Sequence, residues 1–179
     1  AGYDSMEAAA EDGTAFVFMG HGTSHTANVT YDQMQTQMGD LGFTNAFIGT
    51  VEGEPEDTAC EEVIAKVKDA GFKKVVLRPL MVVAGDHANN DMAGDDEDSW
   101  KSQFEASGAF DSVDCQIEGL GRVAAVEDLY VAHTKDAIDS LGTADDAAEV
   151  TDDTEEASDD AAAEETTDDA ADTTEEAAE

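Results

Sequence analysis

The feature that most constrains the fold is a regular alternation of short apolar runs with longer amphipathic segments. Four apolar runs have the length of strands: 15–19, 45–51, 73–83 and 112–118. Each is followed by a segment with apolar residues at helical spacing: 27–40, 55–71, from 98 onward, and 123–141. Strands that alternate with helices form a parallel sheet connected by right-handed crossovers. The sequence therefore predicts an α/β fold, a four-stranded parallel sheet with helices on both faces.

Acidic residues are distributed unevenly along the chain, and this distribution separates a tail from the rest. Its 179 residues contain 44 Asp and Glu against 8 Lys and Arg, a net charge of -36, and 17 of the acids lie in 144–179, where no base occurs. Blocks of like charge with few large apolar residues cannot bury a core, so we expect 143–179 to be a disordered, acidic, low-complexity tail. Residues 14–142 form the expected α/β domain, and 1–13 are expected to be the end of an upstream helix or a linker.

The same charge excludes several classes of partner. Even without the tail, 27 acids face 8 bases, a net charge of -19, and no basic cluster is present. Nucleic acids and anionic membrane surfaces both require such a cluster, so neither is an expected partner. No apolar run approaches the roughly 20 residues that cross a bilayer.

Three residues with potential metal-binding chemistry follow three neighbouring predicted strands. His21 lies between Gly20 and Gly22 after the first strand, Glu52 follows the second, and His87 follows the third. Parallel strands end at one edge of the sheet, where α/β folds bind ligands. Two interpretations remain open. The residues could form a metal or proton-transfer site, since imidazole suits Co, Ni, Fe or Zn. Alternatively, His21 could lie in a glycine-rich turn without a ligand, and Glu52 could be a solvated loop carboxylate.

Longer motifs are more specific. The segments FVFMGHGT (16–23), IGTVEG (48–53), PLMVVAGDHA (79–88) and NDMAGDDEDSWK (90–101) closely resemble those of anaerobic sirohydrochlorin cobaltochelatases of the CbiK type. The match covers about residues 14–140, and it involves only the carboxyl-terminal half of that family's catalytic chain. It implies a chelatase-like half-domain.

The resemblance also implies an activity and roles for residues. The activity is insertion of Co²⁺ into sirohydrochlorin with release of two protons, in anaerobic cobalamin biosynthesis. His21 and His87 would bind the incoming metal, and Glu52 would assist. The partners implied are sirohydrochlorin and a divalent metal, with Co²⁺ as the substrate metal and no organic cofactor expected.

Several alternatives stay open on the sequence. The amino-terminal half of the family or a second chain is expected to close the cleft, and a homo-oligomer is conceivable. Fe²⁺ or Ni²⁺ could replace Co²⁺. The pathway implies a cytoplasmic enzyme, whereas the acidic body and tail also suit a non-enzymatic carrier of metal or of a haem-like tetrapyrrole at the cell envelope.

Overall fold

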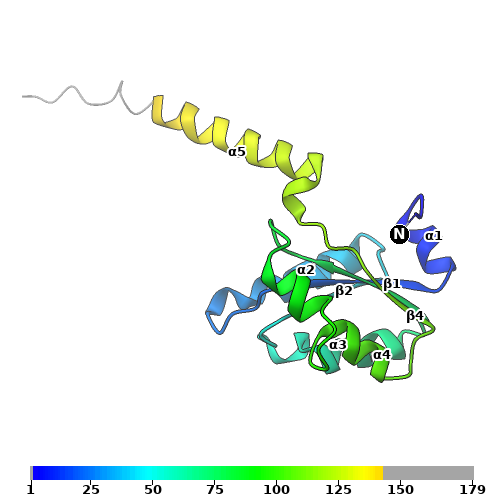
Figure 1. Ribbon diagram of the computed structural model, residues 1–179. Coiled ribbons are helices and arrows are strands. Elements are labelled where there is room, and N and C mark those ends of the chain that lie inside the picture. The colour runs from blue at the N-terminus through cyan, green and yellow to red at the C-terminus, as the bar shows by residue number, and fades with distance from the viewer. Residues whose placement is uncertain (1, 143–179) are drawn as a thin grey trace, which may run out of the picture. The chain divides into compact units, whose positions relative to one another are not determined.

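The computed structural model describes residues 2–142, and the compact unit that contains the whole sheet spans residues 1–139 (Figure 1). The acidic segment 143–179, for which we predicted disorder, lies outside the described residues. Within the described part, no helix is both long enough and apolar enough to cross a membrane.

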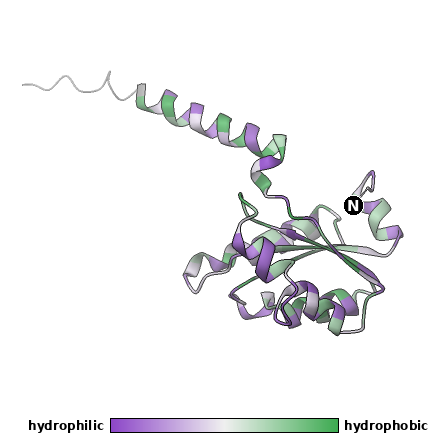
Figure 2. Cartoon of the chain, in the orientation of Figure 1, coloured by the Kyte–Doolittle hydropathy of each residue, from purple (hydrophilic) through white to green (hydrophobic). Residues whose placement is uncertain are grey.

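Four parallel strands form one sheet. In chain order they are β1 (Thr14–Gly20), β2 (Ala46–Thr50), β3 (Lys74–Pro79) and β4 (Ser112–Cys115). Their order across the sheet is β2-β1-β3-β4, and every neighbouring pair is parallel. This confirms the predicted fold class. The central strands carry mostly hydrophobic residues, as strands buried on both faces must (Figure 2).

Within residues 2–142, five α-helices accompany the sheet. They are α1 (Met6–Glu11), α2 (Val29–Asp40), α3 (Cys60–Asp69), α4 (Trp100–Ala106) and α5 (Ala124–Gly142). Short turns of other helix types precede four of these, at Thr26–Asn28, Glu56–Thr58, Ala88–Met92 and Leu120–Arg122. The first helix begins within the predicted 1–13 segment, where the Ser5 side chain caps it by accepting the Ala8 N–H.

Successive residues of each central strand point to opposite faces of the sheet. On one face, alternate residues of β1 and β3 pack with Val63 and Val67 of α3 and with Trp100 and Phe104 of α4. On the other face, Phe16 of β1 packs with Val76 of β3 and with α1. The outer edge of β2 is covered by α2, whose Gln35 side chain accepts the Ile48 N–H and donates to the Ala46 carbonyl.

Two predicted strands are longer in the sequence than in the structure. The run 73–83 ends as a strand at Pro79, and the run 112–118 ends at Cys115. Residues 82 and 83 are apolar but 48% and 73% exposed, so hydropathy alone misassigned them to the buried strand. The helix at 123–141 was predicted correctly, but its apolar side chains are exposed: Leu129, Tyr130, Val131, Ile138 and Leu141.

Candidate metal and tetrapyrrole site

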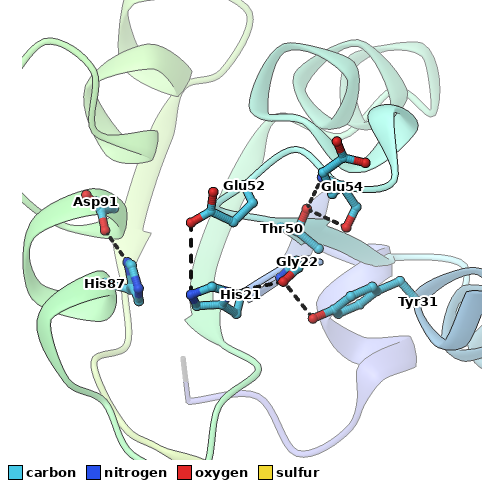
Figure 3. A network of polar contacts seen from close by, with 8 residues as sticks. All are labelled: His21, Gly22, Tyr31, Thr50, Glu52, Glu54, His87 and Asp91. Atoms are coloured by element: carbon cyan, nitrogen blue, oxygen red, sulfur yellow. Dashed lines mark hydrogen bonds and ion pairs between the residues drawn. The ribbon is translucent and has the colours of Figure 1, made fainter. Parts of the chain in front are cut away.

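The three predicted site residues lie together at the carboxyl edge of the sheet (Figure 3). The His21 and His87 rings have centroids 4.9 Å apart and meet edge to face at 79°. Glu52 Oε1 lies 3.9 Å from His21 Nε2. Because β1, β2 and β3 are parallel neighbours, the loops that follow them bring these side chains together, as expected.

Packing beneath His21 explains the glycines on both sides of it. A Cβ at Gly20 would lie 2.6 Å from the Tyr31 ring. Gly22 has a φ of +95°, and a Cβ there would lie 3.0 Å from the Cβ atoms of Thr50 and Glu52. The Gly22 N–H also donates to the Tyr31 hydroxyl at 3.0 Å. Only glycine allows this backbone to pass so close to its neighbours.

Glu52 is positioned by a network of backbone and threonine hydrogen bonds. Its N–H donates to the His21 carbonyl at 2.9 Å, which ties the two site residues through the backbone. The buried Thr50 hydroxyl accepts the Glu54 N–H at 3.1 Å and lies 2.6 Å from the Thr58 hydroxyl. Thr50 and Thr58 therefore hold the loop that follows β2 in a fixed conformation (Figure 3).

His87 has a partner that the sequence reasoning did not identify. Asp91 Oδ2 lies 2.5 Å from His87 Nδ1, and the residue belongs to the π-helical turn Ala88–Met92. The four-residue spacing was the available signal, since residues i and i+4 of a helical turn share a face. Turns of this type are frequent at functional sites.

In the part of the chain that the structure describes, neither ring makes a hydrogen bond through Nε2, although His21 Nε2 lies 3.9 Å from Glu52 Oε1. His21 Nδ1 lies 2.9 Å from the Gly22 carbonyl, and His87 Nδ1 faces the Asp91 carboxylate. A carbonyl and a carboxylate can only accept hydrogen bonds, so Nδ1 carries the proton in each neutral ring. Nε2 of each ring therefore keeps its lone pair, the arrangement that metal-binding histidines use.

The site is open to solvent and bordered by acids. The side chains of His21 and Glu52 are 56% and 52% exposed, and that of His87 is 36% exposed. A pocket of about 380 Å³ adjoins them, lined by four carboxylates among other residues: Glu52, Glu61, Asp91 and Asp98. Within residues 2–142, no group of three or more His, Cys, Asp or Glu side chains is arranged as a complete ligand set.

The cysteines do not join the site. Cys60 and Cys115 are both free thiols. Burial, followed by the charge of Glu61, raises the pKa of the Cys60 thiol to about 12, and burial also raises the pKa of Cys115. A thiol must lose its proton to bind a metal well, so neither is a competitive ligand at neutral pH.

Arg78, Trp100 and Ser99 have structural contacts within the chain. Arg78 Nη2 lies 3.7 Å from Glu118 Oε2, so this guanidinium has an acidic partner within the chain. Trp100 is 3% exposed and packs where Gly49 leaves room for it. Ser99, rather than Asp98, caps α4 by accepting the Ser102 N–H.

Comparison with known proteins agrees with the resemblance seen in the sequence. The cobalt chelatase (CbiK) family profile matches residues 3–139. A sirohydrochlorin cobaltochelatase of Salmonella typhimurium is 43% identical over 123 residues, which cover 69% of this chain and 44% of that protein. The sirohydrochlorin cobaltochelatase CbiKC of Nitratidesulfovibrio vulgaris is 34% identical over 129 residues, covering 71% and 43%.

A solved structure supports the fold separately. The crystal structure of a putative cobalamin biosynthesis CbiX protein from Marinobacter aquaeolei has a TM-score of 0.56 and 16% identity, and the match covers 72% of this chain and 98% of that one. The likeness at this identity shows the fold alone. The chain spans less than half the length of the two curated relatives it matches. It belongs to the CbiK family of cobalt chelatases.

Proposed function

We propose that this chain forms the metal-inserting half of a sirohydrochlorin cobaltochelatase. The observation that carries the proposal is the convergence of His21, His87 and Glu52 at one sheet edge, in a chain of the CbiK family. The family profile matches residues 3–139, a range that contains all three residues, and two relatives named for this activity are 43% and 34% identical to the chain.

The site chemistry suits the transfer of a metal ion. Two imidazole Nε2 atoms suit late first-row cations such as Co²⁺, and a site with few fixed ligands can release the ion again. As cobalt forms bonds to the pyrrole nitrogens, two pyrrole N–H protons must leave the macrocycle. Glu52, exposed beside His21, is the proposed acceptor for these protons before they pass to water.

A second α/β half is part of the proposal. The exposure of His21 and Glu52 supports this, because both side chains are open to solvent whereas a macrocycle held for metal insertion needs contacts on both faces. A second copy of this chain or a separate amino-terminal half would supply the other wall. The mass of the purified protein, measured by sedimentation with and without sirohydrochlorin, distinguishes a monomer from a self-paired dimer.

The activity is tested by following the absorbance of sirohydrochlorin during anaerobic incubation with Co²⁺. His21→Ala and His87→Ala should each lower the enzymatic rate at least about 100-fold, and Glu52→Gln should do so with a smaller effect on Co²⁺ binding. His133→Ala is the matched control, because His133 is an exposed histidine on α5. Rates of both histidine variants equal to that of the control would refute the assigned roles.

The same assay identifies which divalent metal ion the site inserts most efficiently. Parallel reactions with Fe²⁺ and Ni²⁺ at equal free concentration should give lower kcat/KM than the reaction with Co²⁺. A higher value for either ion would assign the chain to a different chelatase reaction on the same site.

A further inference from the structure

A groove lies at the same edge of the sheet, formed by the segments that follow β3 and β4. It has a volume of about 450 Å³, and Val82, Val83, Ile117 and Arg122 are among the residues that line it. The three apolar side chains are 48%, 73% and 46% exposed. Its segment 82–84 leads directly into His87, so the groove adjoins the metal site along the chain.

Close backbone packing builds this groove. The Leu120 N–H donates to the Met81 carbonyl at 2.8 Å, and the Gly121 N–H donates to the Val82 carbonyl at 2.9 Å. A Cβ at Gly119 would lie 2.5 Å from the Val82 carbonyl oxygen. The two segments are therefore joined along their backbones, and the apolar side chains of residues 82 and 83 are left facing solvent by a rigid support.

Arg122 gives the groove a positive charge that forms no ion pair within the described residues. Glu118, which also lines the groove, lies 3.7 Å from the half-buried Arg78 guanidinium. Arg122 has no ion pair within residues 2–142. Lys68 and Lys73 have none either, but of these three bases only Arg122 lines the groove. An exposed apolar wall beside an unpaired guanidinium matches a ligand that combines a flat apolar ring with carboxylates.

We infer that this groove binds the macrocycle of sirohydrochlorin, with Arg122 holding one of its acetate or propionate groups and Val82 and Val83 contacting the ring. The inference rests on the proposed function and adds to it the residues that select the substrate. A carboxylated ring would otherwise be repelled by the acidic body of the protein. Arg122 in the groove therefore attracts the carboxylates of the macrocycle locally, although the net charge of the protein repels them.

The test compares Arg122→Gln with Lys68→Gln. Lys68 is an exposed lysine on α3 that likewise has no ion pair within the described residues, so both changes remove one positive charge. In the cobalt-insertion assay, R122Q should raise the KM for sirohydrochlorin about tenfold with kcat within about twofold of wild type, and K68Q should change neither. Arg122→Lys should recover part of the loss.

Two further readouts separate recognition from a change in folding. Added salt should reduce the difference between wild type and R122Q, because salt screens an exposed charge pair. Val83→Ser should weaken binding of metal-free sirohydrochlorin, measured by absorbance titration, without changing the melting temperature, since this side chain is 73% exposed.

The outcomes distinguish the inference from the proposed function. If wild type inserts cobalt and R122Q has the same KM as K68Q, the groove assignment is wrong and the function stands. If wild type inserts no cobalt but R122Q still loses affinity for metal-free sirohydrochlorin, the groove stands and the function is wrong. If R122Q changes only the sedimenting mass, the groove is a protein interface and the inference fails.

Discussion

Replacing Gly22 with alanine tests how closely the metal site depends on backbone packing. Gly22 has a φ of +95°, where an L residue pays about 1–2 kcal/mol. The added Cβ would also lie 3.0 Å from the Cβ atoms of Thr50 and Glu52. Thr50 is fully buried and hydrogen-bonded to Thr58, so it cannot yield easily. Glu52 is exposed, and we expect it to move away from His21.

The magnitude follows from these two costs. Overpacking typically adds about 1–3 kcal/mol, which brings the expected loss of stability to about 2–5 kcal/mol. Gly71→Ala is the matched control, because Gly71 has a φ of +87° and a Cβ added there would meet no atom within 4 Å. It precedes β3, at the opposite end of the strand from the site, and should lose only about 1–2 kcal/mol.

Urea unfolding and a cobalt titration provide the assay. With a urea m-value of about 2 kcal/mol/M, the midpoint should fall by about 1–2.5 M for G22A and about 0.5–1 M for G71A. Affinity for Co²⁺ should fall in G22A and remain unchanged in G71A. Equal midpoint shifts together with wild-type Co²⁺ affinity in G22A would refute the reasoning.

Three other perturbations have defined outcomes. Asp91→Ala should weaken Co²⁺ binding about 10- to 100-fold, whereas Asp91→Asn, whose side-chain oxygen can still accept a hydrogen bond from His87 Nδ1–H, should retain most of the affinity. A cobalt titration in which both variants match wild type would contradict this. The hydrogen bond from Lys74 lowers the pKa of Asp12. The ionised carboxylate therefore stabilises the fold at pH values above its usual pKa near 4, and this stabilisation is lost as the pH falls through the lower pKa of the folded protein. The difference in urea midpoint between wild type and Asp12→Asn should accordingly shrink on acidification, and a difference independent of pH would exclude the pair as its source. Cys60, with its pKa raised to about 12, should react with a thiol reagent at pH 8 only after unfolding, so rapid labelling of the native protein at this residue would show that the thiol is accessible in the folded state.

The parts of the site that could be predicted are those that depend on strand direction alone. Once the runs ending near residues 20, 51 and 79 are assigned to neighbouring parallel strands, His21, Glu52 and His87 must share an edge. The pattern contains no information on how the loops fold, so the 4.9 Å separation of the rings could not be derived. The roles of the three residues in metal insertion remain predictions.

The errors share a physical origin. Hydropathy extended the third strand through Val83 and indicated an apolar face on the last helix, and the structure exposes Val83, Leu129 and Ile138. An apolar side chain is equally apolar in a core and on a binding surface, so periodicity identifies the helix or strand without identifying what covers it. Tyr31, whose hydroxyl supports Gly22, had no sequence signal because the contact joins a helix to a loop nine residues earlier.

Under the proposed function, the charge of the chain acts on two substrates of opposite sign. The acidic body attracts a divalent cation at long range, and the carboxylates of Glu52, Glu61 and Asp91 continue that attraction up to the imidazoles. The same field opposes a carboxylated macrocycle, and at physiological salt it decays over about 8 Å. If Arg122 contacts the ring as inferred, this one guanidinium can outweigh many distant acids, whereas it could not attract the ring over long distances. Association with the macrocycle should consequently be slower at low salt, and that of Co²⁺ faster, which is the opposite dependence expected of a protein that recruits its anionic ligand through net charge.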